Sequence, residues 1–62
     1  MRNPRSEVVL LSKKFRSDRR MKVKLVEITL ANWDVWYYIM IGPRLQSRTR
    51  YLPEAKKRYK DF

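Results

Sequence analysis

A segment without lysine or arginine, residues 25–43, interrupts an otherwise strongly basic chain. Within it, residues 35–41 are β-branched and aromatic, and they are apolar at odd and even positions alike. A strand that is apolar on both sides is usually central in its sheet, with a neighbouring strand on each edge. The run therefore predicts a central strand. Gly42-Pro43 predicts its end, because proline cannot continue a central ladder.

Residues 21–31 predict a second strand in which the apolar phase changes halfway. Positions 21, 23 and 25 are apolar in the first half, and positions 26, 28 and 30 are apolar in the second. Because strand side chains alternate with period two, this shift indicates either a β-bulge near Leu25-Val26 or burial of the second half on both faces. Asn32-Trp33-Asp34 is the expected hairpin turn before residues 35–41.

Residues 44–51 alternate again, and the spacing changes at Leu52-Pro53. Proline suits the first position of a helix, and Glu54 beside it suits the positive end of the helix dipole. The positions that then share one face at helical spacing are Leu52, Ala55, Tyr59 and Phe62. We therefore expect a strand followed by a helix from Pro53 to about Asp61. A helix of that length is marginal alone, so it must dock on the sheet.

The N-terminal part is less regular. Residues 7–15 fit a strand or a helix, and Val8-Val9 favours the strand. Residues 16–20 predict a loop, and residues 1–6 a flexible basic lead before a single small domain of residues 7–62. The fold class expected is α+β: a small antiparallel β-meander of three or four strands with a short C-terminal helix packed on one face.

Length and composition restrict what can stabilise this fold. A domain of about 60 residues buries only roughly 60% of the surface that its unfolded chain exposes. The 62 residues include neither cysteine nor histidine, which excludes disulfides and a His/Cys metal site. We expect Trp36, Tyr37 and Tyr38 to fill the core, and either Trp36 and Tyr38 or Tyr37 and Ile39 to pack against the helix. We also expect the chain to form a homodimer or to act within a complex.

The same composition argues against catalysis. Histidine and cysteine, the usual acid–base and nucleophilic groups, are absent, and the single glycine, Gly42, rules out a glycine-rich phosphate loop. We expect no enzymatic activity and no cofactor. The apolar runs are too short or too interrupted for a signal peptide or a membrane span, so a cytoplasmic protein is expected.

The charge distribution predicts a polyanionic partner. Residues 1–24 carry 9 basic and 2 acidic side chains, and residues 44–62 carry 7 and 2, within a total net charge of +10. We predict a non-catalytic protein that binds DNA or RNA through a basic sheet face. The residues expected to bind nucleic acid are Arg44, Gln46, Arg48 and Arg50 on one side of a strand, with Lys22, Lys24, Arg19 and Arg20 in support.

A second hypothesis uses the same charge differently. A small interaction protein, of the kind that phages and mobile elements encode, could inhibit or modulate a nucleic-acid enzyme or a ribonucleoprotein. It would contact an acidic protein surface or the RNA of the ribonucleoprotein. Trp33, at the expected hairpin tip, is the candidate contact to a base or a protein pocket.

The expected order over residues 21–62, three or four strands followed by a short helix, is similar to that of small DNA-binding domains of some phage-type integrases. Those domains lay a sheet face on DNA. The likeness is one of topology, and the sequence contains no zinc-finger, homeodomain, RNP or KH pattern.

Overall fold

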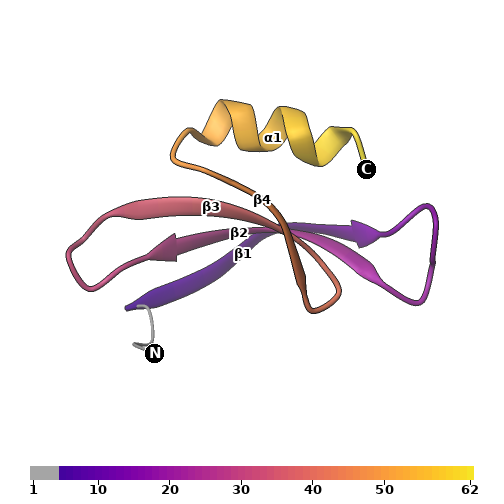
Figure 1. Cartoon of the computed structure of the whole chain (residues 1–62), viewed down its shortest axis with the longest axis horizontal. Helices are drawn as coiled ribbons and strands as arrows, with labels where there is room; N and C mark the ends of the chain where they lie inside the picture. The colour runs from indigo at the N-terminus through magenta and orange to yellow at the C-terminus, as the bar shows by residue number, and fades with distance from the viewer. Residues whose placement is uncertain (1–4) are drawn as a thin grey trace.

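The computed structural model describes residues 5–62, which form a four-stranded antiparallel sheet and one C-terminal helix (Figure 1). The elements are β1 (Ser6–Lys14), β2 (Lys22–Thr29), β3 (Val35–Ile41), β4 (Arg44–Thr49) and α1 (Leu52–Lys60). The strands lie in the sheet in the same order as in the chain. The predicted α+β meander with a docked helix is confirmed.

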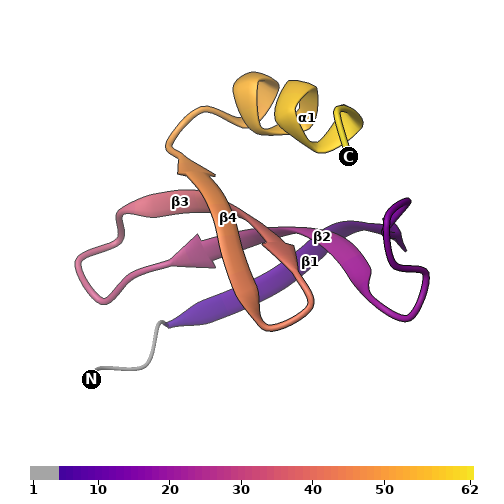
Figure 2. The same cartoon turned by 45° about the vertical axis from the view of Figure 1, so that its right-hand side comes forward.

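The core lies between α1 and the central strands. Figures 1 and 2 both show the helix on one side of a strongly twisted sheet. The buried residues that form this core are Val23, Leu25, Ile39, Ile41, Ala55 and Tyr59. Leu52 and Phe62 pack against its margin, so the predicted apolar face of the helix is the face that docks. Burial of this stripe stabilises a helix that would be marginal alone.

A polar cluster fixes the start of α1 to β4. The Thr49 hydroxyl, on a buried residue, donates to Glu54 Oε2 at 3.0 Å and accepts from the Tyr51 backbone N–H at 3.2 Å. The Arg58 guanidinium donates to the Ser47 hydroxyl and to Glu54 Oε1. These contacts join strand and helix across the short Arg50-Tyr51 connection, and they engage Arg58 within the fold.

The loop after β2 is the predicted hairpin turn, and the loop after β3 is a second tight turn. In the loop after β2, Asn32 Oδ1 accepts from the Asp34 N–H at 3.2 Å, and the Trp33 N–H donates to the Leu30 carbonyl at 2.9 Å. Gly42 has a φ of 57° and opens a two-residue loop with Pro43. A glycine with positive φ at the first of two loop positions is the requirement of a type II′ hairpin turn.

The phase change in β2 has a different origin from a bulge in that strand. The register of β2 with β3 is regular throughout, and Leu25 and Val26 are both buried. The bulge lies in β1, where Leu10 is the extra residue between the pairs Val9–Val26 and Leu11–Leu25. Val23 and Leu25 are buried on the side that α1 covers, Val26 and Ile28 are buried on the opposite face, and Glu27 and Thr29 are only half-buried. The phase change is therefore a change of buried face, and the interruption lies in the neighbouring strand.

The N-terminal strand confirms the choice of strand for residues 7–15 and begins slightly earlier. Ser6 pairs with Thr29, and the Arg5 N–H donates to the Thr29 carbonyl at 2.8 Å. Residues 5 and 6 of the predicted lead thus belong to the sheet. Its residues 1–4 lie outside the described residues.

Candidate nucleic-acid interface

A second bulge, in β4, divides the predicted basic face. Ser47 pairs with Ile39 and Leu45 pairs with Met40, which leaves Gln46 as the extra residue. Side chains alternate along a strand, so Leu45 lies on the face of the sheet away from α1, here called the helix-free face. Arg44 lies on the face that α1 covers, the helix side. The expectation that Arg44, Gln46, Arg48 and Arg50 share one face is therefore wrong, and only Arg48 and Arg50 remain together on the helix-free face.

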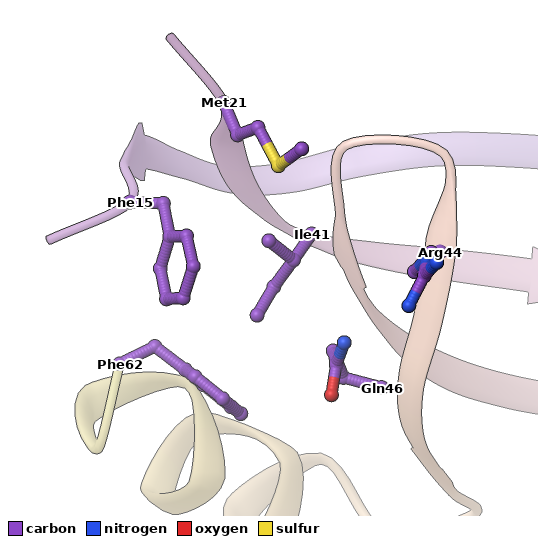
Figure 3. A pocket seen from close by; sticks show the side chains of 6 residues that line it. All are labelled: Phe15, Met21, Ile41, Arg44, Gln46 and Phe62. Carbon is purple, nitrogen blue, oxygen red and sulfur yellow. The ribbon is translucent and has the colours of Figure 1, made fainter. Parts of the chain in front are cut away.

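Arg44 and Gln46 line a pocket at the end of the core instead. The pocket measures about 360 Å³ and is lined by Phe15, Met21, Ile41, Arg44, Gln46 and Phe62. Figure 3 shows the two polar side chains along one wall and the two phenylalanine rings along the other. Arg44 is thus separated from Arg48 by the thickness of the sheet.

Trp36 organises the arginines of the helix-free face. The guanidinium carbons of Arg48 and Arg50 lie 5.6 and 5.3 Å from the centroid of its ring. Both distances are within the range of a cation–π interaction. Arg50 also forms an ion pair with Asp34 at 3.0 Å, and both side chains are exposed. A pair of this kind contributes little to stability, so a phosphate can compete for the same guanidinium.

Three lysines lie on the same face at its opposite corner. Lys22 and Lys24 of β2 share the helix-free face with Met40 and Tyr38, and Lys14 pairs directly with Lys22. Strand spacing and rise place the Cα atoms of Lys24 and Arg48 roughly 12 Å apart, on a diagonal across the sheet. Lys14 was missed by sequence reasoning, because only its register with β2 reveals its face.

Apolar and aromatic side chains fill the space between these two basic corners. Val26 and Ile28 are buried although no helix covers them, since Tyr38 and Trp36 lie directly opposite on β3. Of the two pairs expected to pack against the helix, Tyr37 and Ile39 do so, and Trp36 and Tyr38 do not. Both are half-buried on the helix-free face, and Tyr37 alone of the three faces the helix side and packs against the core.

Trp33 is the exposed tip residue that the sequence predicts. Its side chain is 68% exposed, and its backbone has a φ of 67°, a left-handed conformation that is rare for a bulky residue. The Arg5 guanidinium lies 4.2 Å from the ring centroid, and Arg5 Nε donates to the Ala31 carbonyl at 3.2 Å. Arg5 therefore holds one face of the indole, while most of the ring remains in water.

Two further groups of basic residues, in the β1–β2 loop and on α1, lie outside the helix-free face. Arg19 and Arg20 are exposed in the β1–β2 loop, beyond the Lys14–Lys22 pair, and Arg20 Nε contacts Asp18 Oδ1 at 3.2 Å. The lysines of α1 (Lys56, Lys57 and Lys60) are exposed on the helix, on the other side of the sheet. The loop is thus an extension of the lysine corner, whereas the helix is a separate basic surface.

Two tyrosines on the helix side have shifted titration. Burial raises the pKa of Tyr37 above 10.0, and the negative charge of Glu27, which pairs with it across the strands, raises it further. Burial alone raises the pKa of Tyr59 above the same value. Both phenols are protonated at neutral pH, so neither adds charge to the candidate interface.

No protein-family model, curated protein or solved structure matches this chain. Across residues 5–62, no group of His, Cys, Asp and Glu side chains is arranged to hold a metal ion. The one helix of this region is also too short and too polar to cross a bilayer. The geometry of the helix-free face is therefore the basis for inferring function.

Proposed function

We propose that the protein is a non-catalytic, cytoplasmic nucleic-acid-binding protein that binds DNA or RNA through the helix-free face of its sheet. The observation that supports this most is the position of Trp36, with the guanidinium groups of Arg48 and Arg50 5.6 and 5.3 Å from its ring. Arginine forks suit phosphate oxygens, and an aromatic ring beside them suits a base.

The distribution of charge on this face supports an extended polyanion. Arg48 and Arg50 lie at one corner and Lys14, Lys22 and Lys24 at the other, with Tyr38 and Met40 between them. A nucleic-acid strand on this diagonal would meet phosphate-binding groups at both ends and apolar surface in the middle. Stacking of an unpaired base on an aromatic side chain contributes about 1–3 kcal/mol.

Fluorescence anisotropy with labelled single-stranded DNA, duplex DNA and RNA across a salt series tests this proposal. The variant is Arg48→Ala/Arg50→Ala, and the matched control is Arg44→Ala/Lys56→Ala, which removes the same charge from the other side of the sheet. Two lost phosphate contacts flatten the slope of log K against log salt by about 1.8 for duplex DNA and about 1.4 for a single strand. The control is expected to flatten the slope by less than Arg48→Ala/Arg50→Ala does.

Two outcomes would contradict the proposal. Wild-type protein that binds none of the three nucleic acids at low salt would exclude this function. Equal losses in the two double variants would show that charge matters but that this face is not the site. In a Trp33→Tyr variant, where Trp36 is the single tryptophan, quenching of its emission by bound nucleic acid gives an independent local readout.

A second candidate function rests on Trp33. An exposed indole at a hairpin tip, held on one face by Arg5, is the kind of residue that anchors protein–protein interfaces. In this case the protein would be a small phage- or mobile-element-type interaction protein that modulates a nucleic-acid enzyme or a ribonucleoprotein. Binding to such an enzyme or ribonucleoprotein that is lost in Trp33→Ala but kept in Arg48→Ala/Arg50→Ala would favour this candidate.

A further inference from the structure

Among residues 5–62, no strand pairs with the outer edge of β1. β1 is the first strand of the sheet, and its nine residues pair only with β2. The Phe15 N–H donates to the Met21 carbonyl at 2.9 Å, which makes 15 and 21 a hydrogen-bonded pair. Backbone N–H and C=O groups alternate in direction along a strand, so those of Lys14 and Ser12 point to the free edge. The bulge at Leu10 shifts this alternation by one residue, and beyond it the groups of Val9 and Glu7 point to the free edge.

In the part of the chain that the structure describes, the middle of this edge lacks the features that normally prevent pairing with another chain. Natural edge strands carry charged residues, proline or a covering segment. Here Val8, Val9, Leu10 and Leu11 are consecutive, apolar and each 38–52% exposed. The charged residues Glu7, Lys13 and Lys14 lie only at the two ends of the strand. Helix α1 packs on β2, β3 and β4, and it meets β1 at the Lys13 end, where the ammonium lies 4.5 Å from the centroid of the Tyr59 ring.

We propose that the β1 edge pairs antiparallel with the β1 edge of a second copy, so that two sheets join into one of eight strands. Only one register pairs all four outward residues with one another. It places Glu7 opposite Lys14 of the second copy and Val9 opposite Ser12 of the second copy, and two-fold symmetry repeats each pair. These four residues also share the helix-free face, so the faces of the two sheets are continuous.

Charge complementarity favours a second copy as the occupant. The strand carries an acid at one end and a lysine at the other, at the positions that antiparallel self-pairing brings together. Opposite charges directly across an antiparallel pair are stabilising, and like charges are destabilising. Leu10 lies opposite Leu11 of the second copy near the two-fold axis, where exposed apolar surface is removed from water.

Sedimentation equilibrium of the full chain, from micromolar to near-millimolar concentration, tests the proposal. We expect the mass to rise with concentration from 7.7 kDa toward twice that value. Val9→Lys places a charge in the middle of the edge and is expected to keep the protein monomeric. Leu45→Lys is the matched control: a similarly exposed apolar residue on the opposite edge strand, whose replacement leaves the dimer intact. Circular dichroism confirms that each variant is folded.

A charge exchange tests the register. Glu7→Lys should raise the Kd for self-association about tenfold, because two attractive cross-strand pairs become repulsive. The double variant Glu7→Lys/Lys14→Glu restores both pairs in the exchanged sense and should recover most of the affinity. A folded wild-type monomer at every concentration would overturn the proposal and leave this edge to an extended segment of another protein. Equal weakening by Val9→Lys and Leu45→Lys, or no recovery in the double variant, would also overturn it.

Discussion

Replacement of Leu45 by alanine tests the β4 bulge directly. With regular alternation along β4, Leu45 would share the helix side with Ser47 and Thr49 and would pack beneath α1. With Gln46 as an extra residue, Leu45 lies opposite Met40 on the helix-free face and is 46% exposed. The free energy of unfolding lost in Leu45→Ala therefore distinguishes the two arrangements.

The buried reference is Leu25, which is 0% exposed at the centre of the core. Leucine-to-alanine changes at enclosed sites cost about 2–5 kcal/mol, because a cavity remains. Leu45 keeps almost half of its surface in water and leaves no enclosed cavity, so its loss costs about 1 kcal/mol. That corresponds to a fall in Tm of about 4–8 °C. Leu25→Ala removes most of the roughly 3–5 kcal/mol available to so small a core.

Urea unfolding followed by far-ultraviolet circular dichroism measures both variants on the same scale. The slope of the free energy of unfolding against urea should match the wild type, so that the midpoint alone reports the change. A loss in Leu45→Ala as large as that in Leu25→Ala would refute the bulge and place Leu45 in the core. It would also return Arg44 to the helix-free face, where it would join Arg48 and Arg50.

Two further predictions concern stability. Trp33→Asn should raise the free energy of unfolding by about 0.5–1 kcal/mol. Asparagine relieves the cost of a left-handed backbone, about 1–2 kcal/mol, which exceeds the loss of an exposed contact with Arg5, about 0.5–1 kcal/mol. A lower Tm would show that the stacking on Arg5 dominates. The pKa values of Tyr37 and Tyr59 are raised in the folded state, so the stability that their protonated phenols contribute should be fully present below pH 10.0. It should be lost as the pH rises through the folded pKa. Urea midpoints at alkaline pH check this, and Tyr37→Phe should decline less steeply than the wild type.

Much of the fold could be predicted because its signals are local. Three signals depend on neighbours in the sequence: the apolar run at 35–41, the end of that strand at Gly42-Pro43 and the change of spacing at Pro53. All three correspond to features of the structure. The turn at Trp33 was predicted in the same way from Asn32 and Asp34.

The two bulges could not be predicted, and they decide which side chains share a face. A bulge depends on the pairing of two strands, so the alternation of residues 44–50 gives no sign that Gln46 is the extra residue. The apolar residues of β3 likewise do not indicate which of the two faces the helix covers. For that reason the sequence predicts a core position for Trp36, whereas the residue lies beside Arg48 on the helix-free face.

The agreement between strand order and chain order has a kinetic consequence. Each strand pairs with its neighbour in the chain, through loops at residues 15–21, 30–34 and 42–43. Every strand pairing therefore closes a short loop, which costs little chain entropy before the first contacts form. The distant contacts are those of α1, whose Ala55 and Tyr59 meet Val23 and Leu25. The sheet therefore has the local pairing that favours rapid folding, and docking of α1 adds the most distant contacts of the core.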